Sequence, residues 1–355
     1  MKAIKRYLTS GLVIAMSLVT INSGIAASDA KPVFFPGGDV PARIQFLGNI
    51  DGENFFNNGG SAYGNRFPDY VPTTSVKDAN PFLRPTAVTS FKEEMFVCDM
   101  GKSQITILNF KTKQVSKIDY KFKAPVSITV DADGTRYVLD AGASKVLVFS
   151  AQNKFQRSFS SVEAWKPIDA AIVGELIYVI DGKKDQVLVF NKISGDFVKS
   201  FGQNGESTGE FDMPASIKSD KNGLLYISNT MNGRVDIFNG DGKFLGQYGT
   251  VPNTASGNFA HPQGIALDRE NRIYVVDNSF ENVQIFNDKK QFLMPFGVVG
   301  NTPGGLNMPH AIAIDYDNAS YFSKIVAPGR SIEYIILVAN QTGDHKISVF
   351  GFLKQ

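Results

Sequence analysis

The chain has 355 residues, of which 43% are hydrophobic, and its 36 lysines and arginines nearly balance 34 aspartates and glutamates. The formal net charge of +2 lacks the basic excess that nucleic-acid binding requires, so we expect no nucleic-acid partner. The only cysteine, Cys98, cannot form an intrachain disulfide, and the chain is long enough for its stability to come from a large buried core.

The first 27 residues have the pattern of a secretory signal peptide, because three basic residues precede an apolar run from Leu8 to Ile21. That run is shorter than the roughly 20 residues that a membrane-spanning helix needs. We therefore expect cleavage after Ala26 or Ala27, no membrane insertion afterwards, and an exported protein, periplasmic or extracellular. Removal of the segment changes the net charge from +2 to +2 − 3 = −1.

Residues 28–40 contain two prolines and two glycines and predict an extended leader. The residues from Arg43 to Gly48 then resemble the fourth strand of a repeat whose first three strands do not precede it. A long insertion follows at residues 51–84, rich in glycine, asparagine and aromatic residues.

Insertions of this composition on a compact scaffold often bind ligands or partners. A lid that plugs the centre of the fold or packs on the leader explains the insertion 51–84 equally well, and both alternatives stay open. For the binding alternative, the candidate residues are Phe55, Phe56, Tyr63, Arg66 and Tyr70 in the insertion, together with His310 outside it.

From residue 85 onward a unit of 40 to 48 residues occurs six times, each time opening with a proline. The opening prolines are Pro85, Pro125, Pro167, Pro214, Pro262 and Pro309. Within each copy, an acidic or amide residue ends the second predicted strand, namely Asp99, Asp140, Asp181, Asn229, Asp277 and Asn340. We expect the four aspartates among them to accept hydrogen bonds from backbone N–H groups of the following loop.

Each copy predicts four short antiparallel strands joined by polar turns, as in residues 262–297. A period of this length with four strands is typical of a β-propeller, in which each copy is one blade. The last copy reaches its third strand at residues 347–350 and lacks a fourth. The sequence therefore predicts an all-β, six-bladed propeller over residues 41–355, whose last blade is completed by the N-terminal strand.

The motifs Pro-x-Gly-Ile-Ala-Leu-Asp at Pro262, Ile-Tyr-Val-Val-Asp at Ile273 and Val-Gln-Ile-Phe-Asn at Val283 resemble the NHL-repeat family of six-bladed propellers. The resemblance covers residues 41–355. A second insertion, residues 316–333, and the strands after it are similar to exported bacterial NHL propellers that tend to accompany multihaem cytochromes. This finer resemblance implies a protein partner of that class.

Antiparallel alternation puts the loops that enter the first and third strands of every blade on one face of the ring, which we call the loop face. The insertion 51–84, His261, His310 and His345 are expected there, and the insertion 316–333 on the opposite face. Propeller amidating lyases of this repeat family carry a histidine directly after the opening proline in three blades. The corresponding residues here are Thr86, Val126, Ile168, Ala215, Gln263 and His310.

Because only His310 matches that pattern, we expect no cofactor and no catalytic metal, with His310, Asp169 and His261 as the residual candidates for a divalent cation. Asp169 stands two residues after its proline, where other copies have alanine, serine or glycine. It is expected to project into the centre of the ring and to have a structural partner there, a cation being the alternative.

The function that these features favour is an exported, non-enzymatic binding platform that engages a protein partner or a ligand through one face. The finer resemblance adds an accessory role to extracytoplasmic electron-transfer proteins. A metal-dependent lyase or hydrolase with its site in the channel is the alternative function, and a purely structural module is the third.

Overall fold

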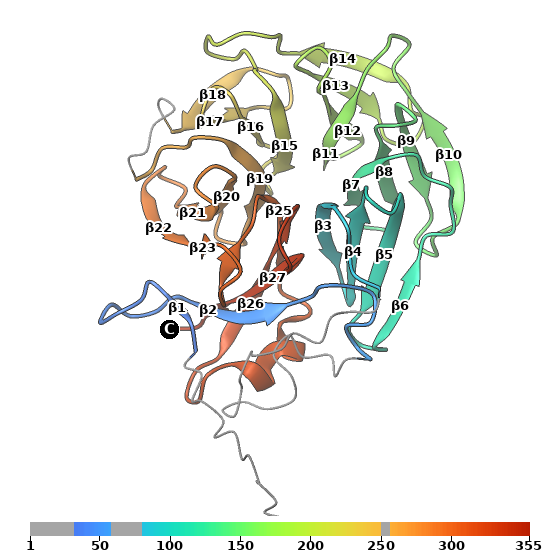
Figure 1. The fold of residues 1–355 in the computed structure, drawn as a ribbon. Coiled ribbons are helices and arrows are strands. Elements are labelled where there is room, and N and C mark those ends of the chain that lie inside the picture. Colours follow the sequence, from blue (N-terminus) through green and yellow to red (C-terminus); the bar gives the residue numbers. More distant parts are fainter. Residues whose placement is uncertain (1–31, 58–79, 250–255) are drawn as a thin grey trace, which may run out of the picture.

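We describe a computed structural model of the chain, which covers residues 32–57, 80–249 and 256–355. Six antiparallel sheets surround a central axis, and the first strand of each sheet lies innermost (Figure 1). The architecture is that of an all-β six-bladed propeller, as the repeat predicts. No helix in the described part of the chain is long and apolar enough to cross a membrane.

The first five blades each contain four strands in sequence order. Blade 1 consists of β3 (Pro85–Phe91), β4 (Glu94–Asp99), β5 (Gln104–Asn109) and β6 (Gln114–Lys117). Blade 2 consists of β7 (Pro125–Val130), β8 (Arg136–Asp140), β9 (Lys145–Phe149) and β10 (Phe155–Phe159). Blade 3 consists of β11 (Pro167–Val173), β12 (Leu176–Asp181), β13 (Gln186–Asn191) and β14 (Phe197–Phe201).

Blade 4 consists of β15 (Pro214–Ser219), β16 (Leu225–Asn229), β17 (Arg234–Phe238) and β18 (Phe244–Tyr248). Blade 5 consists of β19 (Pro262–Leu267), β20 (Ile273–Asp277), β21 (Asn282–Phe286) and β22 (Phe292–Phe296). A short parallel pair, β23 (Val298–Val299) and β24 (Gly305–Leu306), lies in the connection to blade 6.

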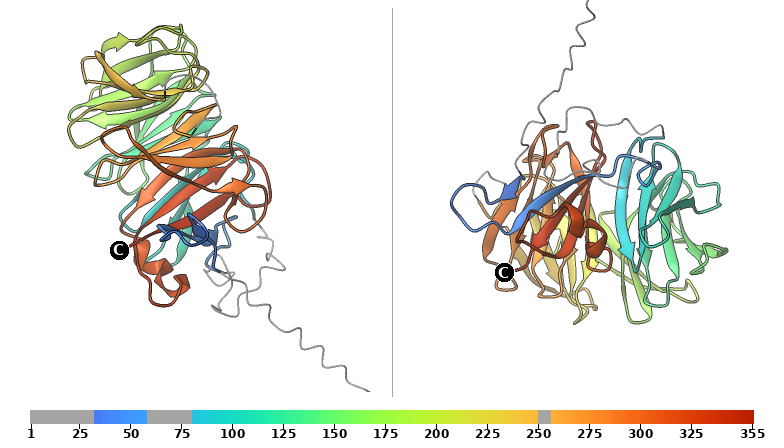
Figure 2. Two further views of the ribbon diagram at one scale, coloured as in Figure 1. Left: turned by 90° about the vertical axis from the view of Figure 1, so that its left-hand side faces the viewer. Right: turned by 90° about the horizontal axis from the view of Figure 1, so that it is seen from below.

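Blade 6 is built from both ends of the described chain. Its order from the outside is β1 (Phe34–Phe35), β2 (Ile44–Asn49), β27 (Ile347–Leu353), β26 (Ile332–Asn340) and β25 (Pro309–Asp315). Strand β2 pairs with β27, with Phe46 opposite Phe350, and the views in Figures 1 and 2 show the blue N-terminal strand against the red C-terminal sheet. The predicted closure is confirmed. Strand β1, within the predicted leader, adds a fifth strand that the sequence pattern does not reveal.

Aromatic side chains repeat where successive blades meet. In four blades a phenylalanine near the end of the third strand contacts an aromatic residue in the connection that leads into the same blade from the preceding one, with centroid distances of 5.9, 5.7, 5.4 and 5.4 Å. The pairs are Phe122–Phe149, Trp165–Phe190, Phe211–Phe238 and Phe259–Phe286. All eight side chains are buried, so these contacts hold neighbouring blades together through apolar burial.

The residue that ends each second strand is buried and binds backbone groups. Asp99 accepts hydrogen bonds from the N–H groups of Leu83 and Arg84 at 2.7 and 2.9 Å and from Lys102 N–H at 3.2 Å. Asp140, Asp181 and Asp277 make the same kinds of contact. The prediction for the following loop is confirmed, and the same carboxylates also hold the loop that enters the first strand.

Candidate functional site

A channel of about 740 Å³ runs along the axis of the ring, within the size range of small-molecule sites. Residues of all six innermost strands line it. Five of the six residues that follow an opening proline border it, namely Thr86, Val126, Ile168, Ala215 and His310. The sixth, Gln263, instead donates a hydrogen bond to Thr230 Oγ1 at 3.3 Å.

Asp169 lies at the centre of a polar network that joins three blades. Its carboxylate accepts hydrogen bonds from Ser127 Oγ at 2.7 Å, Ser216 Oγ at 2.8 Å and Ile217 N–H at 3.0 Å. Lys218 Nζ forms an ion pair with it at 2.7 Å. Ser127 belongs to blade 2, Asp169 to blade 3, and the remaining groups to blade 4.

Burial of the Asp169 carboxylate disfavours its charged form, but the Lys218 ammonium and the hydrogen bonds outweigh that cost and lower its pKa. Both carboxylate oxygens therefore have donors. The expected projection into the centre and the expected structural partner are confirmed, because the partners are protein groups of two neighbouring blades.

His310 borders the channel from β25. Its ring is half-buried towards the channel and surrounded by protein elsewhere, and that burial lowers its pKa to about 4. The Asp169 carboxylate opposes this shift and the Arg84 guanidinium adds to it. The imidazole is therefore neutral at pH 7, and its ring nitrogens have no hydrogen bond to any described residue.

Among the described residues, three cationic side chains and one carboxylate line the channel. Arg84 and Lys166 directly precede the opening prolines of blades 1 and 3, are exposed, and form no ion pair with the described part of the chain. Lys218 is the third cation and is paired with Asp169. Positive charge thus exceeds negative charge at the mouth of the channel on the loop face.

The three histidines do not converge. His261 Nδ1 contacts the hydroxyl of Ser279, and His345 Nδ1 lies 3.3 Å from Asp51 Oδ2, which raises the pKa of His345. Neither lines the channel with His310. Across residues 32–57, 80–249 and 256–355, no group of three or more histidine, cysteine, aspartate or glutamate side chains is placed to hold a metal ion.

Phe55 and Phe56 lie in an aromatic cluster with Phe110, Tyr321 and Phe322. Phe55 is only 5% exposed, so its ring is a packing element and is not available as part of a binding surface. Tyr321 belongs to the 3₁₀ helix η1 (Ala319–Ile325) inside the second insertion, and its ring centroid lies 6.1 Å from that of Phe55.

The prediction that the two insertions occupy opposite faces is therefore wrong for residues 53–57 of the first insertion. Glu53 forms ion pairs with Lys102 and Lys117, near the loop face, whereas Phe56 reaches Phe110 at the turn between the third and fourth strands of blade 1. Phe55 and Phe56 pack their rings between blades 6 and 1, so this segment runs from the loop face towards the opposite face. Tyr63, Arg66 and Tyr70 lie outside the described residues.

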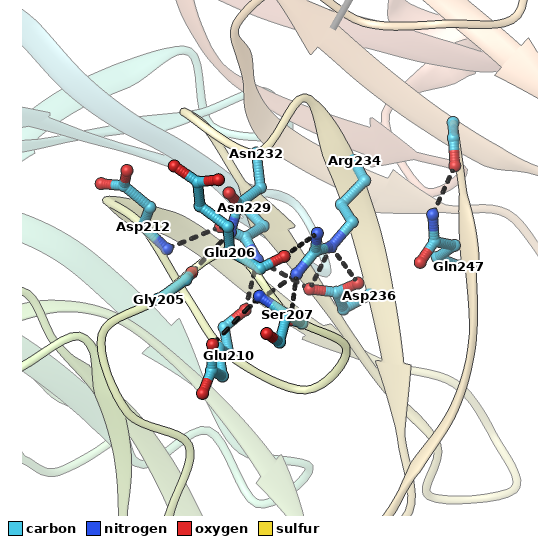
Figure 3. Close-up of polar contacts among 11 residues, drawn as sticks. Gly205, Glu206, Ser207, Glu210, Asp212, Asn229, Asn232, Arg234, Asp236 and Gln247 are labelled. Atoms are coloured by element: carbon cyan, nitrogen blue, oxygen red, sulfur yellow. Dashed lines mark hydrogen bonds and ion pairs between the residues drawn. The ribbon is translucent and has the colours of Figure 1, made fainter. Parts of the chain in front are cut away.

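A buried arginine holds the connection between blades 3 and 4 (Figure 3). Arg234 Nε binds Asp236 Oδ1 at 2.9 Å, and its terminal nitrogens donate to the carbonyls of Glu206, Ser207 and Glu210 at 3.0, 2.8 and 3.0 Å. Asn232 Nδ2 binds Gly205 O at 2.9 Å. This set, which we call the Arg234 clamp, positions the loop that ends at Met213. Sequence reasoning missed it, because the position holds lysine, glutamine or asparagine in other copies.

Several large apolar side chains are exposed in loops on the loop face, and four of them lie close to an opening proline or to the end of a second strand. Leu83, Met213 and Met308 lie one or two residues before an opening proline, and Met231 follows the second strand of blade 4. Their exposed fractions are 53%, 60%, 43% and 47%. The signal that could have found them is the methionine directly before the proline in blades 4 and 6.

No family model matches the chain. It is similar to several solved propellers. A Bacteroides thetaiotaomicron protein of unknown function superposes with a TM-score of 0.62 at 15% identity, over 88% of this chain and 76% of that one. A streptogramin B lyase gives 0.54 at 14% identity, over 79% and 86%. An auxiliary nutrient binding protein from Bacteroides ovatus gives 0.57 at 12% identity, over 77% and 70%. At such identities the likeness shows the six-bladed propeller fold, and the chain is one more member of that architecture.

Proposed function

We propose that this chain is an exported, non-enzymatic binding platform that engages a protein partner through its loop face. The observation that carries the proposal is the position of Leu83, Met213, Met231 and Met308. Large apolar side chains exposed in loops of one face, beside a rigid ring, are typical of protein interfaces, and methionine adapts its shape to different surfaces.

The exported location rests on the signal-peptide pattern of the first 27 residues. The resemblance of the C-terminal region to exported NHL propellers supports a multihaem cytochrome as the partner, in an accessory role to extracytoplasmic electron transfer. Mass spectrometry of the protein isolated from its native envelope tests the export. Cleavage after Ala26 or Ala27 is expected, and a protein that retains Met1 would contradict export by this route.

Retention of haem protein tests whether a multihaem cytochrome is the partner. Immobilised protein is exposed to the envelope fraction, washed, and assayed for the Soret absorbance of retained haem. The variant Met213→Glu/Met308→Glu should lose retention, because two carboxylates would have to be buried in the interface. Its matched control is Ile193→Glu, which alters a 65% exposed side chain at a turn on the opposite face. Equal retention by all three proteins would overturn the proposal.

A metal-dependent lyase or hydrolase in the channel is the second candidate function, and His310 favours it. A neutral imidazole whose nitrogens are uncommitted among the described residues is the form that binds a metal or accepts a proton. One solved neighbour is a catalytically inactive histidine-to-alanine variant of virginiamycin B lyase from Staphylococcus aureus with quinupristin. Stoichiometric zinc or calcium lost in His310→Ala would support this function, whereas metal retention that is equal in both proteins would exclude His310 from it.

A further inference from the structure

Cationic side chains outnumber carboxylates in the channel, and the two cations without a described ion pair lie at its mouth. The Asp169 carboxylate takes donors from Ser127, Ser216, Ile217 and Lys218, so it has little capacity left to attract Arg84 or Lys166. Those two cations border the same cavity without an ion pair to any described residue. An anion at the mouth would supply the missing counter-charge.

The walls next to these cations are apolar. Val126 and Ile168 follow the opening prolines of blades 2 and 3, and Ala124 lies between Arg84 and Lys166 in the order of the blades. Deeper in the channel, the half-buried side chains of Val130, Ile172 and Ile314 continue the apolar lining. A ligand that satisfies both regions has an anionic end and an apolar body.

We propose that the channel mouth binds the carboxylate of a small organic acid, with Arg84 and Lys166 as the charged contacts and the apolar part of the acid extending into the channel. Arg84 offers a planar pair of N–H donors that matches a carboxylate, and Lys166 adds a point charge. This ligand site is separate from the apolar side chains proposed for the protein partner and does not depend on that partner.

Several hydroxyl groups of the channel wall already have acceptors. Thr86 donates to the carbonyls of Cys98 and Pro125, Thr129 to Ala170, and Ser219 to Ile172. These groups therefore add little recognition of a sugar or another polyol. Among the described polar side chains of the lining, those of Arg84, Lys166, His310, Ser90 and Gln341 have no hydrogen bond to a described residue and can meet a ligand.

Hexanoate is the probe, and hexanamide is its uncharged counterpart of the same shape. Calorimetric titration of the purified, full mature protein should show saturable binding of hexanoate and at least tenfold weaker binding of hexanamide. Arg84→Gln and Lys166→Gln should each weaken hexanoate binding roughly tenfold, because each removes one charge-assisted contact. Lys183→Gln is the control, since it removes the same charge from an exposed loop-face residue outside the channel.

A second readout keeps the test decisive if a variant folds poorly. The His310 ring resonances of the wild-type protein should shift on addition of hexanoate and stay in place with hexanamide, because His310 borders the same cavity. Stronger binding of inorganic phosphate than of hexanoate would overturn the assignment to a carboxylate. So would equal affinities of the Lys183→Gln, Arg84→Gln and Lys166→Gln proteins, or binding of a short peptide through its C-terminus with no binding of hexanoate.

Discussion

At the scale of single residues, Asp169 differs from its counterparts in the other copies, which are alanine, serine or glycine. The small counterparts of blades 2 and 4, Ser127 and Ser216, are the groups that donate to its carboxylate. One large acidic side chain thus fits because its neighbours in the ring are short and carry hydroxyls.

Asp169→Asn should lower the free energy of unfolding by about 2 kcal/mol, because the charge-assisted hydrogen bonds become neutral and Lys218 loses its partner. Thermal or urea unfolding measures the change. Ala87→Asn is the control at the same position of blade 1, where no such network exists. A cost for Asp169→Asn of no more than that of the control would show that the network contributes nothing to stability.

His310 should make the protein sensitive to acid. Its folded pKa of about 4 is below the ordinary 6.5, so the unfolded chain binds a proton that the folded chain does not between these values. The stabilisation is present above pH 6.5 and is lost as the pH falls to about 4, by up to about 3 kcal/mol. The contribution of His345 to stability has the opposite pH dependence. Asp51 raises the pKa of His345, so that the stabilisation is lost as the pH rises.

Unfolding of His310→Gln compared with wild type from pH 7 to pH 4 isolates this contribution, because His345 and the carboxylates are common to both. The difference in stability between the two proteins should narrow or reverse in favour of the variant as the pH falls. A constant difference over that range would show that His310 titrates normally in the folded protein.

The departure of Asp169 from the repeat could be read from the sequence, whereas its four donors could not. They come from residues 42 to 49 positions away along the chain, and only the close approach of three blades brings them together. Arg84 and Lys166 had no such signal, because exposed lysines and arginines occur throughout the sequence.

At the scale of elements, the Arg234 clamp shows how a connection between blades becomes ordered. The Asp236 side chain is fully buried, and burial raises its pKa despite hydrogen bonds from Asn229 and Arg234. The carboxylate depends on the guanidinium to remain charged, while the guanidinium in turn binds three carbonyls of the preceding loop.

Arg234→Met should lower the free energy of unfolding by about 3 to 5 kcal/mol, because it leaves a buried carboxylate without its cation. The double variant Arg234→Met/Asp236→Leu should recover part of the loss. Lys199→Met removes a partly exposed ion pair with Asp241 and should cost less than about 1 kcal/mol. Similar costs for Arg234→Met and Lys199→Met would contradict the importance of the clamp.

Closure of the ring depends on β2. Phe46 is buried opposite Phe350, with ring centroids 5.3 Å apart, so Phe46→Ala should cost about 3 to 5 kcal/mol in unfolding free energy. Phe197→Ala, which alters a 57% exposed ring on the outer strand of blade 3, should cost less than about 1 kcal/mol. Equal costs, measured by urea unfolding, would mean that the N-terminal strand adds little to stability.

The element pattern was largely predictable, because each strand repeats its alternation six times and the missing fourth strand of the last copy matched residues 43–48. The course of residues 53–57 was not predictable. Their burial depends on Phe110 and Tyr321, which are distant in sequence and belong to no repeated motif. The two-residue strand β1 was equally invisible, because so short a segment has no periodicity.

At the scale of the whole molecule, a rigid closed ring separates two surfaces. The opposite face carries the turns that join the first strand to the second and the third to the fourth in each blade, and it carries the aromatic cluster around Tyr321. The loop face carries the mouth of the channel, two cations without a described ion pair, and exposed apolar side chains that include Leu83, Met213, Met231 and Met308. We infer that binding concentrates on the loop face, with a small acid at the centre and a protein partner around it.

Site-specific photocrosslinking tests that division between faces most directly. A photoreactive amino acid is placed at Met213 or at Ile193, and the protein is irradiated in its native envelope fraction. We expect one discrete haem-containing adduct from position 213, absent when Met308→Glu is also present, and none from position 193. Adducts that form equally from both positions, or from position 193 alone, would contradict the account.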